Sequence, residues 1–426
     1  MKSDKHAIRS LMDFLHLSAR LEANKVTFSQ FLGLSVVSSK HSKNTESDND
    51  KDINKDATIM HADRFSFLDH PLSNSSTSLV FRYRFPSKNR LRYLNNNNNN
   101  NNNDDDDDDD NDKQQYRGPS LSTYTSILDE VTTLGLMAAS PKDTRPGVSV
   151  TMQSQWGAAH AQAQDPAQSS SSLLLEEVDI VTTITKRGRT LAFVRAEVRD
   201  PSNNNDGVIC YFDHVKYLPV GWMLSLLFTP VGMWCLNLYL QYILPYMNTN
   251  TYQDGGGGGG KSKNMEPMNS EHSKIMDSFQ KTSDTTATFQ FGEQHANGFG
   301  GLHGGVQAIL MEYLGQSVAQ NELSKFHLNY SNDSNSSSSS SSSSSDMVVE
   351  CERLQISYQS SATRVLELRA HIMEPPRFDH PSVVLRIEIL RSNKKSQKDS
   401  RNKPVVVSEG ILTFTSAASV MKAKEQ

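Results

Sequence analysis

Hydrophobic and polar positions follow the same order in two segments of the chain, residues 75–218 and 268–420. Each segment opens with a short stretch that alternates as a strand does, continues with an amphipathic helical stretch, and ends with several further strand-like stretches. This order indicates an internal repeat, in which one structural unit occurs twice.

The first segment begins with an alternating strand at residues 78–85. Apolar side chains then recur at spacings of three and four residues, which places them on one helical face: Ile127, Leu128, Val131, Leu134 and either Met137 or Ala138. The helix ends before Pro141. Four stretches rich in β-branched and aromatic residues predict antiparallel strands at 147–156, 176–188, 189–200 and 207–218. Residues 186–189 predict a hairpin turn, in which Gly188 is able to take a positive φ.

The second segment repeats this plan, with a strand at 285–294 and a loop and helix at 301–320. The helix again has one apolar face, formed by Val306, Ile309, Leu310, Leu314 and Val318. Four strands are predicted after it, at 348–358, 364–373, 382–391 and 405–417. A long helix wrapped by an antiparallel sheet of about five strands is an α+β arrangement, and we expect the two copies to pair as a homodimer would.

The chain has 426 residues, and several homopolymeric tracts lie between the periodic stretches: Asn at 95–103, Asp at 104–110, Gly at 255–260 and Ser at 336–345. Such tracts bury no apolar surface and are typical of disordered segments. The expected organisation is therefore an N-terminal region at 1–74, partly disordered, a first domain at 75–218 with an insert at 95–112, a connector at 219–267, and a second domain at 268–420 with an insert at 331–346.

The connector begins with an uncharged apolar stretch of 29 residues at 219–247. Its length suffices to span a bilayer, but Pro230 near its middle and the polar Asn237 and Gln241 weaken that interpretation. A single span would also place the two copies on opposite sides of the membrane. Four interpretations of this stretch stay open: a membrane span, a shallow hairpin, an interfacial helix, or a helix that covers protein surface.

Charge and cysteine content exclude several functional classes. The Asp run together with Asp112 contributes eight carboxylates, and without them the net charge changes from −5 to about +3, so no basic excess indicates nucleic-acid binding. The three cysteines, Cys210, Cys235 and Cys351, have no CxxC spacing, which argues against a disulfide framework and a structural zinc site. Residues 1–28 have no continuous apolar core typical of a secretory signal. We expect an intracellular protein, cytoplasmic or membrane-associated, while a mitochondrial or plastid location stays open.

Two glycine-rich motifs differ in their context. Residues 255–262 match a phosphate-binding loop in letters only, because no buried strand precedes them and no helix follows. The informative motif is at 297–305, where Asn297 precedes His303, Gly304 and Gly305, a helix follows, and Glu312 stands nine residues after the histidine. Glycines at the start of a helix present backbone N–H groups to a substrate carbonyl at the positive end of the helix dipole, and a nearby Asn adds a donor.

The pattern N-x-x-G-x-x-H-G-G with an acid nine residues after the histidine resembles hotdog-fold acyl-CoA thioesterases of the PaaI and 4-hydroxybenzoyl-CoA type. The first copy is similar to the mammalian acyl-coenzyme A thioesterase 13 group through four segments in the same order: 128–137, 145–150, 186–193 and 214–218. The resemblance covers both copies, and it implies two hotdog units in one chain, paired as a pseudo-dimer.

In that family each active site lies across a dimer interface. Carried over to this chain, the resemblance implies that the second copy supplies Asn297, His303, Gly304 and Gly305, and that the first supplies Asp129 as the carboxylate and Ser149 to position water. The other composite site is expected to be degenerate. Ser120, Leu121 and Ser122 replace its H-G-G element, and Glu312 and Cys351 take the acid and serine positions.

These residues predict hydrolysis of an acyl-CoA thioester to a free acid and coenzyme A at one working site, with no metal or cofactor. Four basic residues were considered as contacts for coenzyme A phosphates, with ordinary surface charge as the alternative: Lys186, Arg187, Arg189 and Lys216. Two other functions stay open. One is a non-catalytic acyl-CoA-binding or scaffold protein, and the other is a hotdog dehydratase.

Overall fold

The structure is a computed structural model that describes residues 65–68, 78–85, 119–139, 147–163, 177–201, 207–218, 231, 235, 278–292, 295–297, 301–333, 349–360, 362, 365–377, 381–391 and 404–416. The homopolymeric tracts, and the apolar connector except Val231 and Cys235, lie outside these residues. The predictions of disorder and of membrane contact therefore stay predictions. Within the described part of the chain, no helix is both long and apolar enough to cross a membrane.

The described elements fall into two series along the chain. The first comprises β1 (Phe65–Leu68), β2 (Ser78–Arg84), α4 (Leu121–Ala138), β3 (Val148–Trp156), α5 (Ala158–Ala163), β4 (Glu177–Arg187), β5 (Leu191–Arg199) and β6 (Val208–Tyr217). The second comprises β7 (Phe279–Lys281), β8 (Thr286–Gln290), α10 (Gly304–Asp333), β9 (Val349–Tyr358), β10 (Val365–Glu374), β11 (Ser382–Arg391) and β12 (Val405–Ser416).

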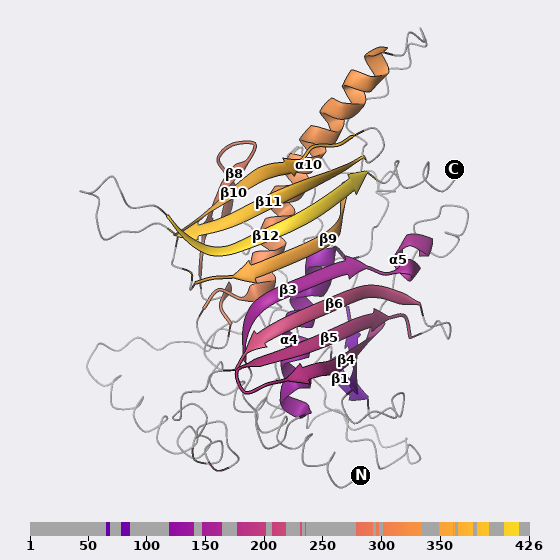
Figure 1. Cartoon of the computed structure of the whole chain (residues 1–426), viewed down its shortest axis with the longest axis vertical. Coiled ribbons are helices and arrows are strands. Elements are labelled where there is room, and N and C mark those ends of the chain that lie inside the picture. The colour runs from indigo at the N-terminus through magenta and orange to yellow at the C-terminus, as the bar shows by residue number, and fades with distance from the viewer. Residues whose placement is uncertain are drawn as a thin grey trace, which may run out of the picture.

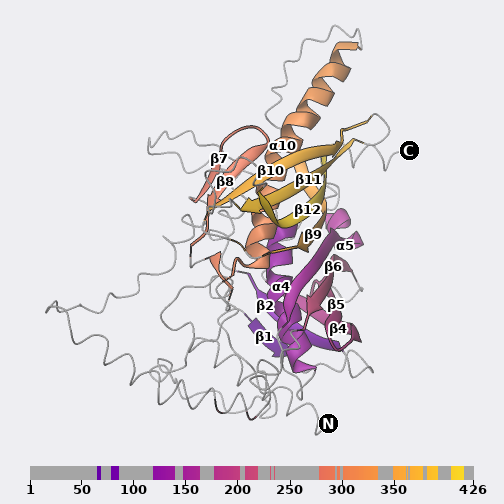
Figure 2. The same cartoon turned by 60° about the vertical axis from the view of Figure 1, so that its left-hand side comes forward.

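All strands of the described residues belong to one sheet in which every neighbouring pair is antiparallel, in the order β1-β2-β4-β5-β6-β3-β9-β12-β11-β10-β8-β7. The two halves of this order match strand for strand, and they meet where β3 pairs with β9. The helices α4 and α10 pack against each other and against the same face of the sheet (Figures 1 and 2). The result is a mostly antiparallel α+β protein, with the same plan in each half.

The register at the junction relates the two halves residue by residue. Gln153 of β3 pairs with Gln355 of β9, so positions 202 apart in these strands are counterparts. Each strand also carries a bulge at the equivalent place. The pairing of β3 with β6 skips residue 150, and the pairing of β9 with β12 skips residue 352. Ser149 and Cys351, which precede these bulges, are therefore structural counterparts.

The helix α4 forms because its sequence provides both a cap and a core. Ser120 is its N-cap and accepts a hydrogen bond from the backbone N–H of Thr123 at 3.3 Å. Most of its side chains are buried, since one side of α4 contacts α10 and the other contacts the sheet. Its apolar residues join those of α10 and of the strands in one hydrophobic core. A polar group on such a helix is thus held away from bulk water.

Local predictions were mostly confirmed, with several differences. The second helix was expected to end at residue 320, but α10 continues to Asp333, within the range 331–346 assigned to an insert, and α5 was not predicted. The hairpin at residues 186–189 joins β4 to β5 as expected, but among the described glycines a positive φ occurs at Gly147, at 71°, and not at Gly188. Gly147 lies immediately before β3, where the chain turns into the strand. The short edge strands β1 and β7 were not predicted, and β1 lies within the range 1–74 assigned to the N-terminal region. Strands of three or four residues are too short for their alternation to be recognised.

Gly315 of α10 tests the close packing of this helix on the sheet. A Cβ at Gly315 would lie 2.7 Å from Cζ of Phe414 and 3.0 Å from Cδ1 of Ile387. We expect Gly315→Ala to lower the free energy of unfolding by about 1–3 kcal/mol, because overpacking outweighs the gain in helix propensity. Chemical denaturation measures this change. Lys325→Ala, at an exposed position of α10, is the control and should change it by less than about 0.5 kcal/mol. An increase in stability for Gly315→Ala would contradict the packing.

Candidate active site

The carboxylate of Asp129 lies where the middle of α4 meets the first residue of α10. Asp129 is 5% exposed. A Cβ added to Gly304 would be 2.6 Å from its Oδ2 and 2.9 Å from the hydroxyl of Tyr358. Only glycine at position 304 lets the carboxylate approach the N-terminus of α10 this closely. The structure thus brings together Asp129 of the first half and Gly304 of the second.

Four polar side chains surround this carboxylate. Ser149 donates its hydroxyl to Oδ1 at 2.9 Å, and Nζ of Lys216 lies 3.5 Å from the same oxygen. Nε2 of His214 is 3.6 Å from Oδ1, and Nδ1 of His303 is 3.7 Å from Oδ2. Burial alone would raise the pKa of Asp129, but the charge of Lys216, followed by those of His303 and His214, lowers it below the ordinary value. Asp129 is therefore ionised at neutral pH.

His214 links Ser149 to α4. Its Nδ1 lies 2.8 Å from Oγ1 of Thr132, and its Nε2 lies 3.0 Å from Oγ of Ser149. Because the Thr132 hydroxyl donates to the carbonyl of Leu128 at 2.6 Å, the proton between Thr132 and His214 belongs to Nδ1. Burial and the charge of Lys216 hold the pKa of His214 well below its ordinary value. A neutral His214 thus presents an unprotonated Nε2 to Ser149.

His303 has a different environment, at the start of α10. Its Nε2 is hydrogen-bonded to Oε1 of Glu130, and its Nδ1 accepts the backbone N–H of Gly305 at 2.9 Å. Burial lowers the pKa of His303, but the hydrogen bond and charge of Glu130 and the charge of Asp129 outweigh burial and raise it. An Nδ1 that accepts from Gly305 corresponds to the tautomer with its proton on Nε2. His303 therefore shapes the glycine turn.

Asn297 also braces this turn. Its Oδ1 accepts the N–H of Gly301 at 3.0 Å, and its own N–H donates to the carbonyl of Gly301 at 2.7 Å. Residues 298–300 of the motif lie outside the described residues. Tyr358 of β9 closes the other side, because its hydroxyl donates to the carbonyl of Gly304 at 3.2 Å. Burial, with the charge of Asp129, raises the pKa of Tyr358 well above its ordinary value.

The counterpart region of the other half has a different chemistry. Glu312, the counterpart of Asp129, accepts the backbone N–H of Ser122 at 2.8 Å and is 7% exposed. Burial raises the pKa of Glu312, although hydrogen bonds from Ser122 and Ser120 oppose the shift. The register places Leu412 and Phe414 where the first half has His214 and Lys216. In the second half, Phe414 therefore stands at the position of Lys216, so this position holds no cation. Cys351 stands at the position of Ser149, and burial raises the pKa of its thiol.

The four basic residues considered for phosphate binding have different surroundings. Lys186 and Arg189 are exposed at the turn between β4 and β5. Arg187 donates to the carbonyl of Leu136 at 3.0 Å, at the end of α4. Lys216 is only 2% exposed, so it lies within the site beside Asp129 and not at the surface, where a phosphate contact was expected. Among the described residues, no group of three or more His, Cys, Asp and Glu side chains is arranged to hold a metal ion.

Three side chains of this region were not singled out in the sequence: His214, Glu130 and Tyr358. For His214 a signal exists, because alternation along β6 places it on the same face as Cys210, Phe212 and Lys216, and all four are buried. A His and a Lys at core-facing positions of a strand are costly unless they are paired. Glu130 and Tyr358 have no comparable signal, because their role depends on how α4 and β9 approach α10.

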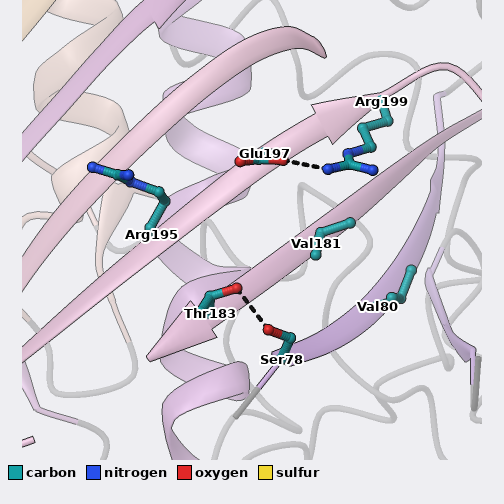
Figure 3. Close-up of a pocket in the computed structure, with 7 residues that line it drawn as sticks. All are labelled: Ser78, Val80, Val181, Thr183, Arg195, Glu197 and Arg199. Carbon is teal, nitrogen blue, oxygen red and sulfur yellow. Dashed lines mark hydrogen bonds and ion pairs between the residues drawn. The ribbon is translucent and has the colours of Figure 1, made fainter. Parts of the chain in front are cut away.

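A pocket of about 220 Å³ lies on the outer face of the sheet, over β2, β4 and β5 (Figure 3). Its lining residues alternate along the strands with those that face α4, and they are Ser78, Val80, Val181, Thr183, Arg195, Glu197 and Arg199. Arg199 donates to Glu197 at 2.6 Å, and Arg195 donates to Asp213 at 2.9 Å. The pocket is separate from Asp129, and its arginines already have carboxylate partners.

The stability of the protein should respond to pH in opposite senses at the two acids. The pKa of Asp129 is lowered, so its stabilising effect is present above its ordinary value of 3.8 and is lost as pH falls through the folded-state pKa. The pKa of Glu312 is raised, so its contribution is present below its ordinary value of 4.5 and is lost as pH rises through the folded-state pKa.

We therefore expect Asp129→Asn to reduce the melting temperature most at neutral pH and progressively less below about pH 4. Glu312→Gln should gain stability relative to wild type as pH rises above about 4.5, because the amide removes a buried charge. Thermal denaturation of the three proteins between about pH 3 and 8 measures both trends. Equal pH dependence in the two variants would contradict the asymmetry.

Comparisons with known proteins give matches in structure alone. No family model and no curated protein matches the sequence. A putative oleoyl thioesterase from Lactobacillus plantarum is 10% identical with a TM-score of 0.35, over 70% of this chain and 89% of its own. Thioesterase superfamily member 2 from Mus musculus is 18% identical with a TM-score of 0.23, over 37% and 84%. A protein of unknown function with a hotdog fold from Alicyclobacillus acidocaldarius is 7% identical with a TM-score of 0.36, over 81% and 94%. The solved structures that the chain is similar to thus include thioesterases and a protein with a hotdog fold, each at low sequence identity.

Proposed function

We propose that the chain is an acyl-CoA thioesterase with one composite active site between two hotdog copies that pair as a pseudo-dimer. One observation carries this proposal. The ionised carboxylate of Asp129, from the first half, lies against Gly304, at the N-terminus of α10 in the second half. A base and an electrophile-binding helix terminus are the two groups that thioester hydrolysis needs.

We assign the thioester carbonyl to the backbone N–H of Gly304. The N–H of Gly305 already donates to His303, so Gly304 is the better suited of the two glycines. As the first residue of α10, Gly304 directs its N–H outward at the positive end of the helix dipole. Asn297, held by Gly301 through Oδ1, adds amide N–H donors on Nδ2.

Asp129 acts as the general base in this mechanism. Oδ2 takes a proton from a water molecule, and the water oxygen forms a bond to the thioester carbon while the carbonyl electron pair moves to the oxygen held by Gly304. The tetrahedral intermediate then collapses, the carbon–sulfur bond breaks, and Asp129 returns the proton to the coenzyme A sulfur. Ser149 is hydrogen-bonded to Oδ1 and orients the carboxylate and the water.

The second composite site lacks the groups that this mechanism uses. Glu312 accepts the N–H of Ser122, and Leu412 and Phe414 stand at the strand positions that His214 and Lys216 occupy in the first half. We therefore propose one working site per chain. Lys186 and Arg189, exposed at the turn between β4 and β5, stay proposed contacts for coenzyme A phosphates. The intracellular location also stays a prediction.

The first test is thiol release from short, medium, long and aromatic acyl-CoAs by the full chain. Asp129→Asn should lower kcat by about 100- to 10,000-fold, because general base catalysis is lost. Glu312→Gln, at the counterpart position, should keep kcat within about threefold of wild type.

The outcomes separate the candidate functions. Loss of activity in Glu312→Gln and not in Asp129→Asn would overturn the assignment of the working half. Tight binding of acyl-CoA without any thiol release by wild type would favour a binding or scaffold protein. Turnover of enoyl-CoA or 3-hydroxyacyl-CoA without thiol release would favour a dehydratase.

Gly304 provides an independent test of the site. Gly304→Ala should lower kcat by at least about 100-fold, because the new Cβ would lie only 2.6 Å from Oδ2 of Asp129 and displace the base. The displaced atoms are side-chain ends, so the free energy of unfolding should fall by less than about 2 kcal/mol. Gly305→Ala differs, because its Cβ would lie 2.7 Å from the backbone of Ser126 and push the helices apart. Equal activity of wild type and Gly304→Ala would place the site elsewhere.

A further inference from the structure

We propose that the buried Lys216 is a positioning residue of this site, which binds one oxygen of Asp129 and the oxygen of Ser149 so that the other carboxylate oxygen faces the start of α10. This role deepens the proposed hydrolysis and rests on it. It also replaces the surface contact with a coenzyme A phosphate that the sequence had led us to consider for Lys216.

The burial of Lys216 requires a specific partner. Its side chain is almost fully buried on the core-facing side of β6. Removing an ammonium group from water costs several kcal/mol unless an anion compensates. Nζ lies 3.5 Å from Oδ1 of Asp129 and 3.3 Å from Oγ of Ser149. Its position is thus explained by these two oxygens, and both belong to the proposed catalytic machinery.

Lys216 supplies hydrogen-bond donors that Ser149 alone lacks. Ser149 has one hydroxyl proton and two neighbours that accept it, Oδ1 of Asp129 at 2.9 Å and Nε2 of His214 at 3.0 Å. When the hydroxyl turns to His214, Oδ1 loses its hydrogen bond from Ser149. The ammonium of Lys216 carries three donors and reaches both Oδ1 and Oγ. It therefore holds Oδ1 in either orientation of the Ser149 hydroxyl.

With Oδ1 occupied, the remaining oxygen of Asp129 has a defined task. Oδ2 is the atom that would meet a Cβ at Gly304, so it faces the N-terminus of α10. Charged and titratable groups face Lys216 and Asp129 from every element packed here, namely Glu130 on α4, His214 on β6, His303 before α10 and Tyr358 on β9. Burial lowers the pKa of Lys216, and the charges of Asp129 and Glu130, with the hydrogen bond to Asp129, oppose this shift. His214 is held neutral, and His303 is bonded to Glu130 and Gly305, so Lys216 is the cation that contacts Oδ1.

The second half of the chain provides an internal comparison. The register pairs Ser149 with Lys216 and Cys351 with Phe414, so Phe414 is the counterpart of Lys216. The fold therefore accepts a large apolar side chain at this position. The half with Phe414 contains Glu312, whose pKa is raised. The half with Lys216 contains Asp129, whose pKa is lowered. The cation thus accompanies the carboxylate that must be ionised.

The test is the pH dependence of hydrolysis by Lys216→Met, which keeps length and removes charge. We expect the acid limb of kcat/KM to move to higher pH by about 1 to 3 pH units, as for a carboxylate that loses a neighbouring cation. At its optimum pH, kcat should fall at least tenfold while KM changes less than threefold. Lys216→Arg should keep the acid limb within about 0.5 pH units of wild type. Lys325→Met, at an exposed position of α10, should leave both unchanged.

A second measurement keeps the inference testable without activity. The carboxyl carbon of Asp129, identified by its absence in Asp129→Asn, can be titrated by NMR in wild type and in the Lys216 variants. If Lys216→Met does not fold, Lys216→Gln and Lys216→Arg replace it. We expect neutral variants to titrate at higher pH than wild type and Lys216→Arg to resemble wild type.

Two results would overturn the proposal. One is an unchanged Asp129 titration and acid limb in the neutral variants. The other is a raised KM with unchanged kcat, which indicates a coenzyme A contact. Absence of hydrolysis by wild type, together with the expected titration shift, would refute the proposed function and leave the pairing of Lys216 with Asp129 supported.

Discussion

The antiparallel pairing of β3 with β9 is the interaction on which the rest of the structure depends. It joins two halves of the sheet and places α4 beside α10 on one face. Asp129 meets Gly304 only because these helices lie side by side, and Ser149 reaches the carboxylate because it precedes the bulge of β3. A shift of the register by one residue would turn Ser149 to the other face of the sheet and dismantle the site.

The cost of burying charge explains why the two halves differ. A fully buried carboxylate is tolerated when a cation or several hydrogen bonds compensate for the lost water. In the first half Lys216 and Ser149 contact the carboxylate of Asp129, and its pKa is lowered. In the second half the backbone N–H of Ser122, at a helix N-terminus, bonds to Glu312, and apolar Leu412 and Phe414 stand at the positions of His214 and Lys216. The same fold thus holds one buried acid with a lowered pKa and another with a raised pKa.

Much of the fold was predictable, because alternation and helical periodicity are strong in the long strands and in α4 and α10. Asp129, Ser149, His303 and Gly304 are brought together as the motif resemblance implied. The surroundings of Lys216 were not foreseen, because a lysine on a strand is ordinarily exposed and only its phase with Cys210 and Phe212 shows that it points inward. Contacts such as Glu130 with His303 arise from the approach of helices far apart in sequence, and no local pattern encodes them.

Because both halves lie in one polypeptide, a substitution in one half leaves the sequence of the other half unchanged. In a protein assembled from two identical subunits, every substitution appears at both sites, so neither site can be altered while the other is preserved. Covalent linkage removes that constraint. Here Cys351, Leu412 and Phe414 stand at the positions that Ser149, His214 and Lys216 occupy in the first half, and only the first half has the polar cluster around Asp129. If the proposed site is the working one, covalent linkage allows the second half to hold apolar packing residues where the first half holds polar ones.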